Sequence, residues 1–350
     1  EPVTGSPKTA LPPKKKKDMF GKTKLFLIIA SMLCMASCDT IREDLPRCEL
    51  WLEFAFDYNM EYADAFNPQV KSVDVFVFGS DDKLLFSKRA EATALIGGNR
   101  MSLTNELDFG NYKVLTVGSL SDNFHALDNA GRELVPGTTT LRQLTVALKR
   151  ASDIVDFEFQ HLYFSGVVEV DHLPSNTDHK VYRVNLIRNT NRFNIALMKY
   201  GEGQKNGTQY TFEIQAPESA TYSWENEPTH QGPVHYVPHY TGQGETSDVF
   251  VSARLNTMRL FNRDGWDYQF IIKNADTGTK IWSYDLMKLL SIARPTSRHD
   301  GTELPFQEYL DRQSEWNLIF TVTEKSGGGE FIQIGLVVGT WIYWLHGIEI

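Results

Sequence analysis

The sequence is poor in cysteine and carries none of the common catalytic motifs. Its 350 residues include only three cysteines, Cys34, Cys38 and Cys48. No G-x-S-x-G, H-E-x-x-H, P-loop or paired C-x-x-C pattern occurs. The glycine-rich segment 201–207 has the wrong glycine spacing for a dinucleotide fingerprint and is predicted to be a turn. We therefore expect a protein that is not an enzyme and that uses no cofactor.

Long hydrophobic runs are also lacking. A transmembrane helix needs about 20 predominantly apolar residues. The apolar run at 25–36 is shorter than this, and the run from Leu336 to Leu345 is interrupted by Gly339 and Thr340. Any membrane attachment is therefore expected to use lipid rather than a helix.

The run at 25–36 has the organisation of a secretory signal. Lys22 and Lys24 precede it, and the small residues Ala36 and Ser37 stand immediately before a cysteine. A basic flank, a short apolar region and a small-residue cleavage site are the three parts of such a signal. An ordinary cleaved signal or a buried apolar helix is the alternative interpretation.

With a cysteine directly after the cleavage site, the segment resembles the lipobox of bacterial lipoproteins. The resemblance implies a signal peptide at 19–37 and a polar tether at 38–47. It also implies that Cys38 carries an S-diacylglycerol and an N-palmitoyl group. Cys34 suits the peptidase less well, because a bulky leucine precedes it. Residues 1–18 are expected to be upstream translation or the result of a mis-set start.

The charge becomes strongly negative once the signal is removed. Residues 1–37 carry seven lysines and two acids, whereas 38–350 carry 28 basic and 42 acidic residues, a formal charge of −14. A chain of this charge is repelled by nucleic acid and by anionic lipid surfaces. Nucleic acid is therefore not expected as a partner.

From Cys48 onward the apolar residues recur with a period of two, which is typical of half-buried strands. We expect an all-β protein of two tandem antiparallel β-sandwich domains, at 48–178 and 179–350. The strands are expected at 50–56, 73–78, 84–86, 100–109, 113–120, 163–170, 181–186, 193–197, 210–215, 249–255, 268–273, 280–283, 317–323 and 331–350. Short helices are expected at 285–292 and 306–311 in the second domain, 141–148 as either helix or strand, and 218–247 as an irregular connection.

Two local patterns resemble functional sites but favour structural interpretations. Asp276-Thr277-Gly278 matches the aspartic protease tripeptide, but a second copy is lacking, so a hairpin turn is predicted. His230, His235 and His239 have ligand-like spacing. However, Pro233 and Pro238 prevent a regular helix there, and no acid or cysteine completes the set. No metal site is therefore expected.

The segment 218–247 is rich in aromatic residues. Trp224, His235, Tyr236 and Tyr240 are the residues that we expect to face a partner or to stack on a glycan. The alternative is that they form an ordinary aromatic-rich connection.

A longer resemblance covers essentially all of 38–350. The stretch Phe306-Gln307-Glu308-Tyr309-Leu310-Asp311-Arg312, followed by Glu315 to Phe320, resembles a signature of the Mfa-type fimbrial anchor and accessory lipoproteins. Further pieces are similar to that family: Cys48-Glu49-Leu50, Val73 to Phe78, Leu186 to Phe193, and Trp341 to Ile350.

This resemblance implies two transthyretin-like sandwiches and a role in fimbriae. The protein would sit in the outer membrane, anchor fimbriae to the cell surface, and assist their assembly or length control. Acidic residues after Cys38 resemble a surface-export signal, although they also suit a solvated linker. The implied partner is a fimbrial shaft subunit, bound by strand addition. A tip or accessory adhesin and a surface glycan-binding lipoprotein are the alternatives.

Overall fold

The computed structural model describes residues 49–173, 179–200, 209–243, 249–296, 301–324, 331–338 and 341–345. The expected signal peptide, Cys38, the tether, Cys48 and the turn at 201–207 lie outside these ranges. Within them, no helix is both long and apolar enough to cross a membrane.

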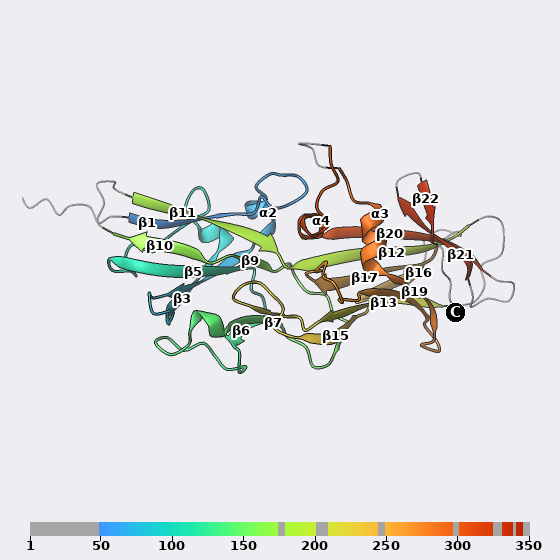
Figure 1. Cartoon of the computed structure of the whole chain (residues 1–350), viewed down its shortest axis with the longest axis horizontal. Helices are drawn as coiled ribbons and strands as arrows, with labels where there is room; N and C mark the ends of the chain where they lie inside the picture. The colour runs from blue at the N-terminus through green and yellow to red at the C-terminus, as the bar shows by residue number, and fades with distance from the viewer. Residues whose placement is uncertain are drawn as a thin grey trace, which may run out of the picture. The chain divides into compact units, whose positions relative to one another are not determined.

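The regular secondary structure of the described chain is almost entirely strand, which confirms the expected all-β class (Figure 1). The strands of the first half are β1 (Glu49–Ala55), β2 (Ser72–Phe78), β3 (Leu84–Glu91), β4 (Arg100–Ser102), β5 (Gly110–Gly118), β6 (Phe124–Asp128), β7 (Leu144–Leu148), β8 (Ile154–Val155), β9 (Tyr163–Ser165), β10 (Val168–His172) and β11 (His179–Arg188). Those of the second half are β12 (Thr190–Lys199), β13 (Tyr210–Glu218), β14 (Thr221–Ser223), β15 (Gln231–Tyr236), β16 (Tyr240–Gln243), β17 (Val249–Met258), β18 (Gln269–Asn274), β19 (Lys280–Asp285), β20 (Glu315–Glu324), β21 (Phe331–Val338) and β22 (Trp341–Trp344). The helices are α2 (Phe66–Gln69), α3 (Leu286–Ile292) and α4 (Phe306–Arg312), with 3₁₀ turns η1 (Ala92–Ala94) and η2 (Leu141–Gln143).

The first sheet is buried on both of its faces in the middle. Its strands follow the order β3-β2-β5-β9-β11-β1-β4, with β10 pairing to β5. On β2, Val73, Val75 and Val77 pack with the β1 side chains, whereas Phe76 and Phe78 pack on the other face with residues of β6 and β7. Burial on both faces explains why β2 reads as an almost continuous apolar run.

The last strand of the first sheet leads directly into the second half. The expected domain boundary at 178 placed the strand after it in the second sandwich. Instead, β11 pairs in parallel with β1 and antiparallel with β9, so it belongs to the first sheet. Only Asn189 separates β11 from β12, and the change of sheet occurs there. Parallel pairing with a distant strand leaves no local mark in the sequence, so the boundary was misplaced.

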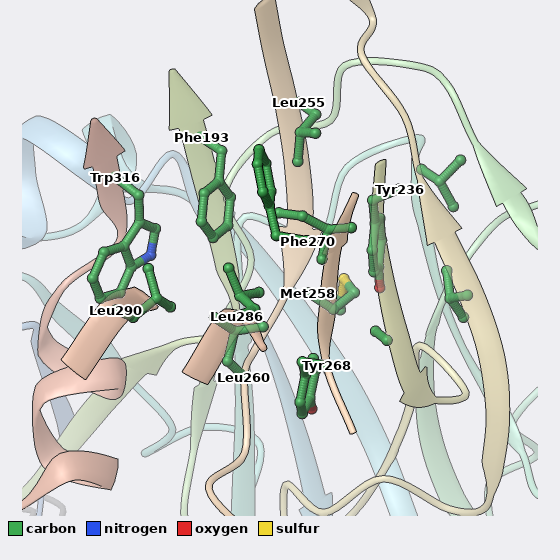
Figure 2. Close-up of a cluster of buried hydrophobic side chains, with 14 of the residues drawn as sticks. Phe193, Tyr236, Leu255, Met258, Leu260, Tyr268, Phe270, Leu286, Leu290 and Trp316 are labelled. Carbon is green, nitrogen blue, oxygen red and sulfur yellow. The ribbon is translucent and has the colours of Figure 1, made fainter. Parts of the chain in front are cut away.

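The second half forms a sandwich of a six-stranded sheet, β16-β17-β12-β20-β21-β22, and a five-stranded sheet, β19-β18-β13-β15-β8, to which the first half contributes the edge strand β8. Figure 2 shows the core between them, where Phe193 of β12 and Leu255 of β17 lie near Phe270 of β18. Helix α3 adds Leu286 and Leu290 to the same cluster. Asp285 caps this helix by accepting a hydrogen bond from the Lys288 backbone N–H. Both expected helices of this domain are therefore present.

Several local expectations differ from the structure. The segment expected to be irregular contains the strands β14, β15 and β16, which are too short and too interrupted by Pro and Gly to show a clear period. The expected strand 100–109 is reduced to β4, 163–170 is divided between β9 and β10, and 141–148 is η2 followed by β7. The turn at Asp276 is confirmed, because the Asn274 side chain accepts hydrogen bonds from the backbone N–H groups of Asp276 and Thr277 between β18 and β19.

Glu218, at the end of β13, is a carboxyl group sealed inside this core. It is 1% exposed, and its Oε1 accepts a hydrogen bond of 2.9 Å from the Tyr236 hydroxyl, while its Oε2 accepts one from the Ala220 N–H. Burial raises its pKa from 4.5 to about 7, against the opposing effect of these hydrogen bonds. Below a pH of about 7, the folded state therefore favours the protonated carboxyl group over the carboxylate.

We predict that Glu218 makes folding pH-dependent in a defined window. The folded state keeps the proton up to a pH of about 7, whereas the unfolded state loses it above 4.5. As the pH rises between those values, the folded state binds more protons than the unfolded state, so stability falls, by about 3 kcal/mol at full ionisation. Glu218→Gln should remove this part of the dependence. Urea denaturation of both proteins at pH 5, 6, 7 and 8 would measure it, and parallel pH profiles would contradict the prediction.

Candidate functional site

The first strand, β1, is an interior strand of the first sheet. It pairs in parallel with β11, from Glu49 opposite His179 to Ala55 opposite Asn185, and antiparallel with β4 on its other side. Alternate apolar side chains of β1 and of the residue after it are fully buried, namely Leu50, Leu52, Phe54 and Phe56. The segment closest to the expected lipid attachment is therefore held on both sides by backbone hydrogen bonds and by its apolar face.

Helix α4 carries the sequence that resembles the anchor signature, and its side chains are structural. The Gln307 side chain accepts a hydrogen bond of 2.7 Å from the Asn262 N–H and donates one of 3.0 Å to the Leu260 carbonyl. Tyr309 packs edge-on against Trp316, with ring centroids 5.4 Å apart. These contacts fix α4 against the connection that follows β17 and against the start of β20.

Asp311 forms a paired ionic contact with Arg259. Arg259 Nε lies 2.7 Å from Asp311 Oδ1, and Nη2 lies 2.8 Å from Oδ2. Both side chains are largely buried. A two-pronged guanidinium–carboxylate pair offers specific geometry, but either charge left alone at such a site is costly.

Arg312 reaches from α4 to the first half of the chain. Its guanidinium carbon lies 4.1 Å from the ring centroid of Tyr58 and 4.4 Å from that of Tyr62. Its Nη1 also donates a hydrogen bond of 3.2 Å to the Asn59 carbonyl, while its Nε pairs with Glu308 Oε1 at 2.7 Å. The signature helix thus joins the segment after β1 to the second sandwich.

The four residues expected to form one partner-facing loop do not lie on one surface. Tyr236 is 1% exposed and donates its hydroxyl hydrogen to Glu218, so its expected exposure was wrong. Its position in β15 points it into the core, as Figure 2 shows. Trp224, just after β14, is half-buried against the same core, with the Arg142 guanidinium carbon 5.6 Å from its ring centroid.

His235 and Tyr240 lie on different sheets. His235, on β15 of the five-stranded sheet, has its Nδ1 2.6 Å from Glu213 Oε1, and Lys273 pairs with the other oxygen of that carboxylate. Tyr240 begins β16, the edge of the six-stranded sheet, and is 49% exposed. Arg254 lies across its ring, with 5.1 Å between the guanidinium carbon and the centroid. Of the four, Tyr240 alone is a solvent-exposed aromatic ring.

The histidines of this region form no metal site in the structure. The His235 ring forms a hydrogen bond with the Glu213 carboxylate, and the ring of the exposed His230 forms one with the Thr229 hydroxyl. Within the ranges that the structure describes, no group of three or more His, Cys, Asp or Glu side chains could hold a metal ion.

An edge with exposed aromatic side chains lies at the end of the chain. β22 pairs with β21 through Trp341 to Trp344 and is the last strand of the six-stranded sheet among the described residues. Trp341 is 73% exposed, and Tyr343 is exposed as well. A glycine on β21, Gly335, permits the close packing of β22, because a Cβ there would lie 2.5 Å from Ile342 Cγ2. Edge strands with free backbone groups are the places where another chain can pair.

A protein-family comparison matches residues 45–347 to the fimbrillin-A associated anchor proteins Mfa1 and Mfa2. The chain belongs to this family. The match confirms the resemblance based on the α4 signature and gives the protein a fimbria-associated place at the cell surface. The family is one of structural proteins and is not known for enzymes. No curated protein matches the chain.

Solved structures share the fold of this chain. A candidate adhesin from Bacteroides ovatus is 76% identical, with a TM-score of 0.83, and the match covers 89% of this chain and 99% of that one. A structure described as candidate polysaccharide-binding proteins from Bacteroides thetaiotaomicron is 28% identical, with a TM-score of 0.69, over 85% of this chain and 98% of that one. The fimbrial anchor protein Mfa2 from Porphyromonas gingivalis shares the fold, with a TM-score of 0.60 at 16% identity, covering 85% and 98%.

The sequence reasoning missed the residues that hold the signature helix in place. Tyr58 and Tyr62 precede α2 in a segment to which no element was assigned, and their contact with Arg312 joins positions about 250 residues apart. Arg259 was also missed. A lone arginine after a strand carries no local signal for a carboxylate partner on a later helix.

We predict that Asp311→Asn destabilises the protein by roughly 3–5 kcal/mol, because it leaves the Arg259 charge buried and unpaired. The substitution keeps the shape of the side chain, so the effect reports the charge. The matched control is Asp276→Asn, in an exposed turn, which should change stability by less than about 0.5 kcal/mol. Urea denaturation measures both, and equal midpoints for the two variants would contradict the structural role of the pair.

Proposed function

We propose that this protein is an outer-membrane lipoprotein, acylated on Cys38, that holds fimbriae at the cell surface and assists their assembly or length control. The family match supports the association with fimbriae. The observation that carries the anchoring role is the position of β1, which begins eleven residues after Cys38 and lies inside the first sheet.

An anchor needs an unbroken connection between its lipid and its folded body. The tether at 38–47 could span at most about 35 Å when fully extended, so the body would stay close to the membrane. The first element that this tether meets is β1, whose removal would break two strand ladders. It would also expose four large apolar side chains, Leu50, Leu52, Phe54 and Phe56, worth about 6–12 kcal/mol of burial in total. A chain that keeps β1 therefore transmits load from the membrane into its core.

The fimbrial partner, in this proposal, adds a strand to the edge formed by β22. Backbone hydrogen bonds would supply affinity, and alternate side chains would supply specificity. Trp341 and Tyr343 suit such an interface, because exposed aromatic residues are enriched at protein contacts and are costly to leave in water. The other ends of the two large sheets offer less. β4 is only three residues long, and β16 is as short as β22 but carries one exposed ring rather than two. β3 has eight residues, but it exposes the charged side chains of Arg89 and Glu91, which oppose the addition of a strand.

A tip or accessory adhesin is the second candidate within the same family. An adhesin would be carried at the far end of the fimbria, so it would leave the cell with sheared fimbriae. An anchor would stay with the membrane after shearing. Fractionation of sheared cells therefore separates the two roles.

We predict that Cys38→Ala releases the protein from membranes, because the acylated side chain would be lost. The matched control is Cys34→Ala, which removes the neighbouring thiol inside the proposed signal and should leave the protein membrane-bound. Membrane and soluble fractions are compared by immunoblot, and mass spectrometry of the N-terminal peptide tests for the lipid. Membrane retention of Cys38→Ala with an unmodified N-terminus would overturn the lipoprotein assignment.

We predict that Trp341→Ser combined with Tyr343→Ser reduces co-purification of the fimbrial subunit at least tenfold, without a change in the folding midpoint. The two rings are exposed, so the folded body loses little, whereas an added strand would lose its main side-chain contacts. Ile96→Ser, at an exposed apolar residue of the first half, is the control and should not change co-purification. Unchanged capture by the double variant would exclude this edge as the partner site.

A further inference from the structure

The solvent face of the six-stranded sheet carries a straight row of polar side chains and one aromatic ring. Tyr240 of β16 lies opposite Arg254 of β17, Arg254 lies opposite Asn194 of β12, and Asn194 lies opposite Asn317 of β20. Directly opposite residues share a face of a sheet, and all four are exposed. The row therefore crosses four strands at right angles to them (β12, β16, β17 and β20 in Figure 1).

The next row on the same face consists of three small residues and one isoleucine. Gly242 lies opposite Ser252, Ser252 opposite Ala196, and Ala196 opposite Ile319. Because the side chains of the first row are mostly longer than those of the second, a trough of about 380 Å³ lies between them, lined by members of both rows. Three intervals between neighbouring strands, of about 4.8 Å each, give a length of about 14 Å.

Gly242 sets the position of the aromatic ring. A Cβ at this position would lie 2.7 Å from the Tyr240 hydroxyl and 3.1 Å from Ser252 Oγ. The ring therefore leans along β16 over the glycine, and Arg254 lies across it. Tyr240 is 49% exposed in this position and lines the trough.

The two amides are held by each other and still have free capacity. Asn194 Nδ2 donates a hydrogen bond of 3.0 Å to Asn317 Oδ1. An amide group has two donor hydrogens and a carbonyl oxygen with two acceptor sites. The bond thus fixes both side chains, while the Asn194 oxygen and the Asn317 amino group can serve a ligand.

The lining chemistry selects an uncharged ligand with hydroxyl groups. Among the described residues that line the trough there is no carboxylate and no lysine, and the one cation, Arg254, stacks on a ring. A sugar ring offers an apolar C–H face for an aromatic side chain and hydroxyls for amide and guanidinium groups. A protein partner would instead need a larger apolar area, and an added strand would pair at an edge rather than on a face. An anionic polymer would be disfavoured by the acidic chain.

We propose that this trough binds a neutral glycan, with one sugar ring on Tyr240 and its hydroxyls bonded by Asn194, Asn317 and Arg254. The site is separate from the proposed contact with a fimbrial subunit at β22, which lies at the opposite edge of the same sheet. Loss of one activity should therefore leave the other intact.

Affinity electrophoresis in gels that contain an α-glucan, a β-glucan, a mannan or a galactan tests the proposal. The full chain should be retarded by at least one of these neutral polymers. Tyr240→Ala should abolish the retardation, and Asn317→Ala should weaken binding about tenfold, as loss of one hydrogen bond implies. Gly242→Ala should also weaken it, because the added methyl displaces the ring without removing a recognition group.

Phe109→Ala, an exposed ring of the first half, is the control and should bind like the wild type. Equal thermal midpoints for all variants show that the effects are local. Retardation of the wild type by none of the four polymers, or unchanged retardation of Tyr240→Ala, would overturn the proposal. Fimbriae that stay attached in a Tyr240→Ala strain would show that the glycan site and the anchoring role are independent.

Discussion

The constraint on which the structure depends is the continuous ribbon formed by β11 and β12. β11 completes the first sheet with β1 and β9, and after Asn189 the chain becomes the central strand of the six-stranded sheet. Asn189 is fully buried, and its Oδ1 accepts a hydrogen bond of 3.0 Å from the Asn226 amide. A buried amide must find such a partner, so the crossing point is fixed. The first sheet and the sandwich of the second half are therefore two parts of one structure, and one continuous apolar cluster extends through both.

Helix α4 secures the same junction from the outside. Arg312 holds the segment after β1, while Asp311 holds the segment after β17. This explains why the signature that resembles the family is a helix of mixed charge rather than a catalytic or binding motif. Its residues hold the N-terminal strand β1 and the strands of the second half in one folded body. The glycan trough uses the solvent face of that body, where no core residue is needed.

The sequence predicted those features that depend on local pattern. Alternation in β1, β12 and β20 indicated strands, and the helices α3 and α4 were placed to within about two residues. It did not predict the sheet to which β11 belongs, because its partner β1 lies far away in the chain. Tyr236 was expected at the surface, since nothing nearby shows that its hydroxyl has a buried carboxylate as its partner. The row from Tyr240 to Asn317 exists only through the register of four strands, so Tyr240 could be named as an exposed ring but its neighbours could not.

The parallel pairing of β1 with β11 also governs how the chain reaches its native state. Glu49 and His179 are opposite each other although 130 residues separate them, so the first sheet cannot close until β11 is available. Contacts of such long range slow folding, because a large loop must be ordered before they are made. Until then the apolar side chains of β1 have no partner and are prone to aggregate. During synthesis, therefore, the first sheet stays incomplete until β11 has left the ribosome.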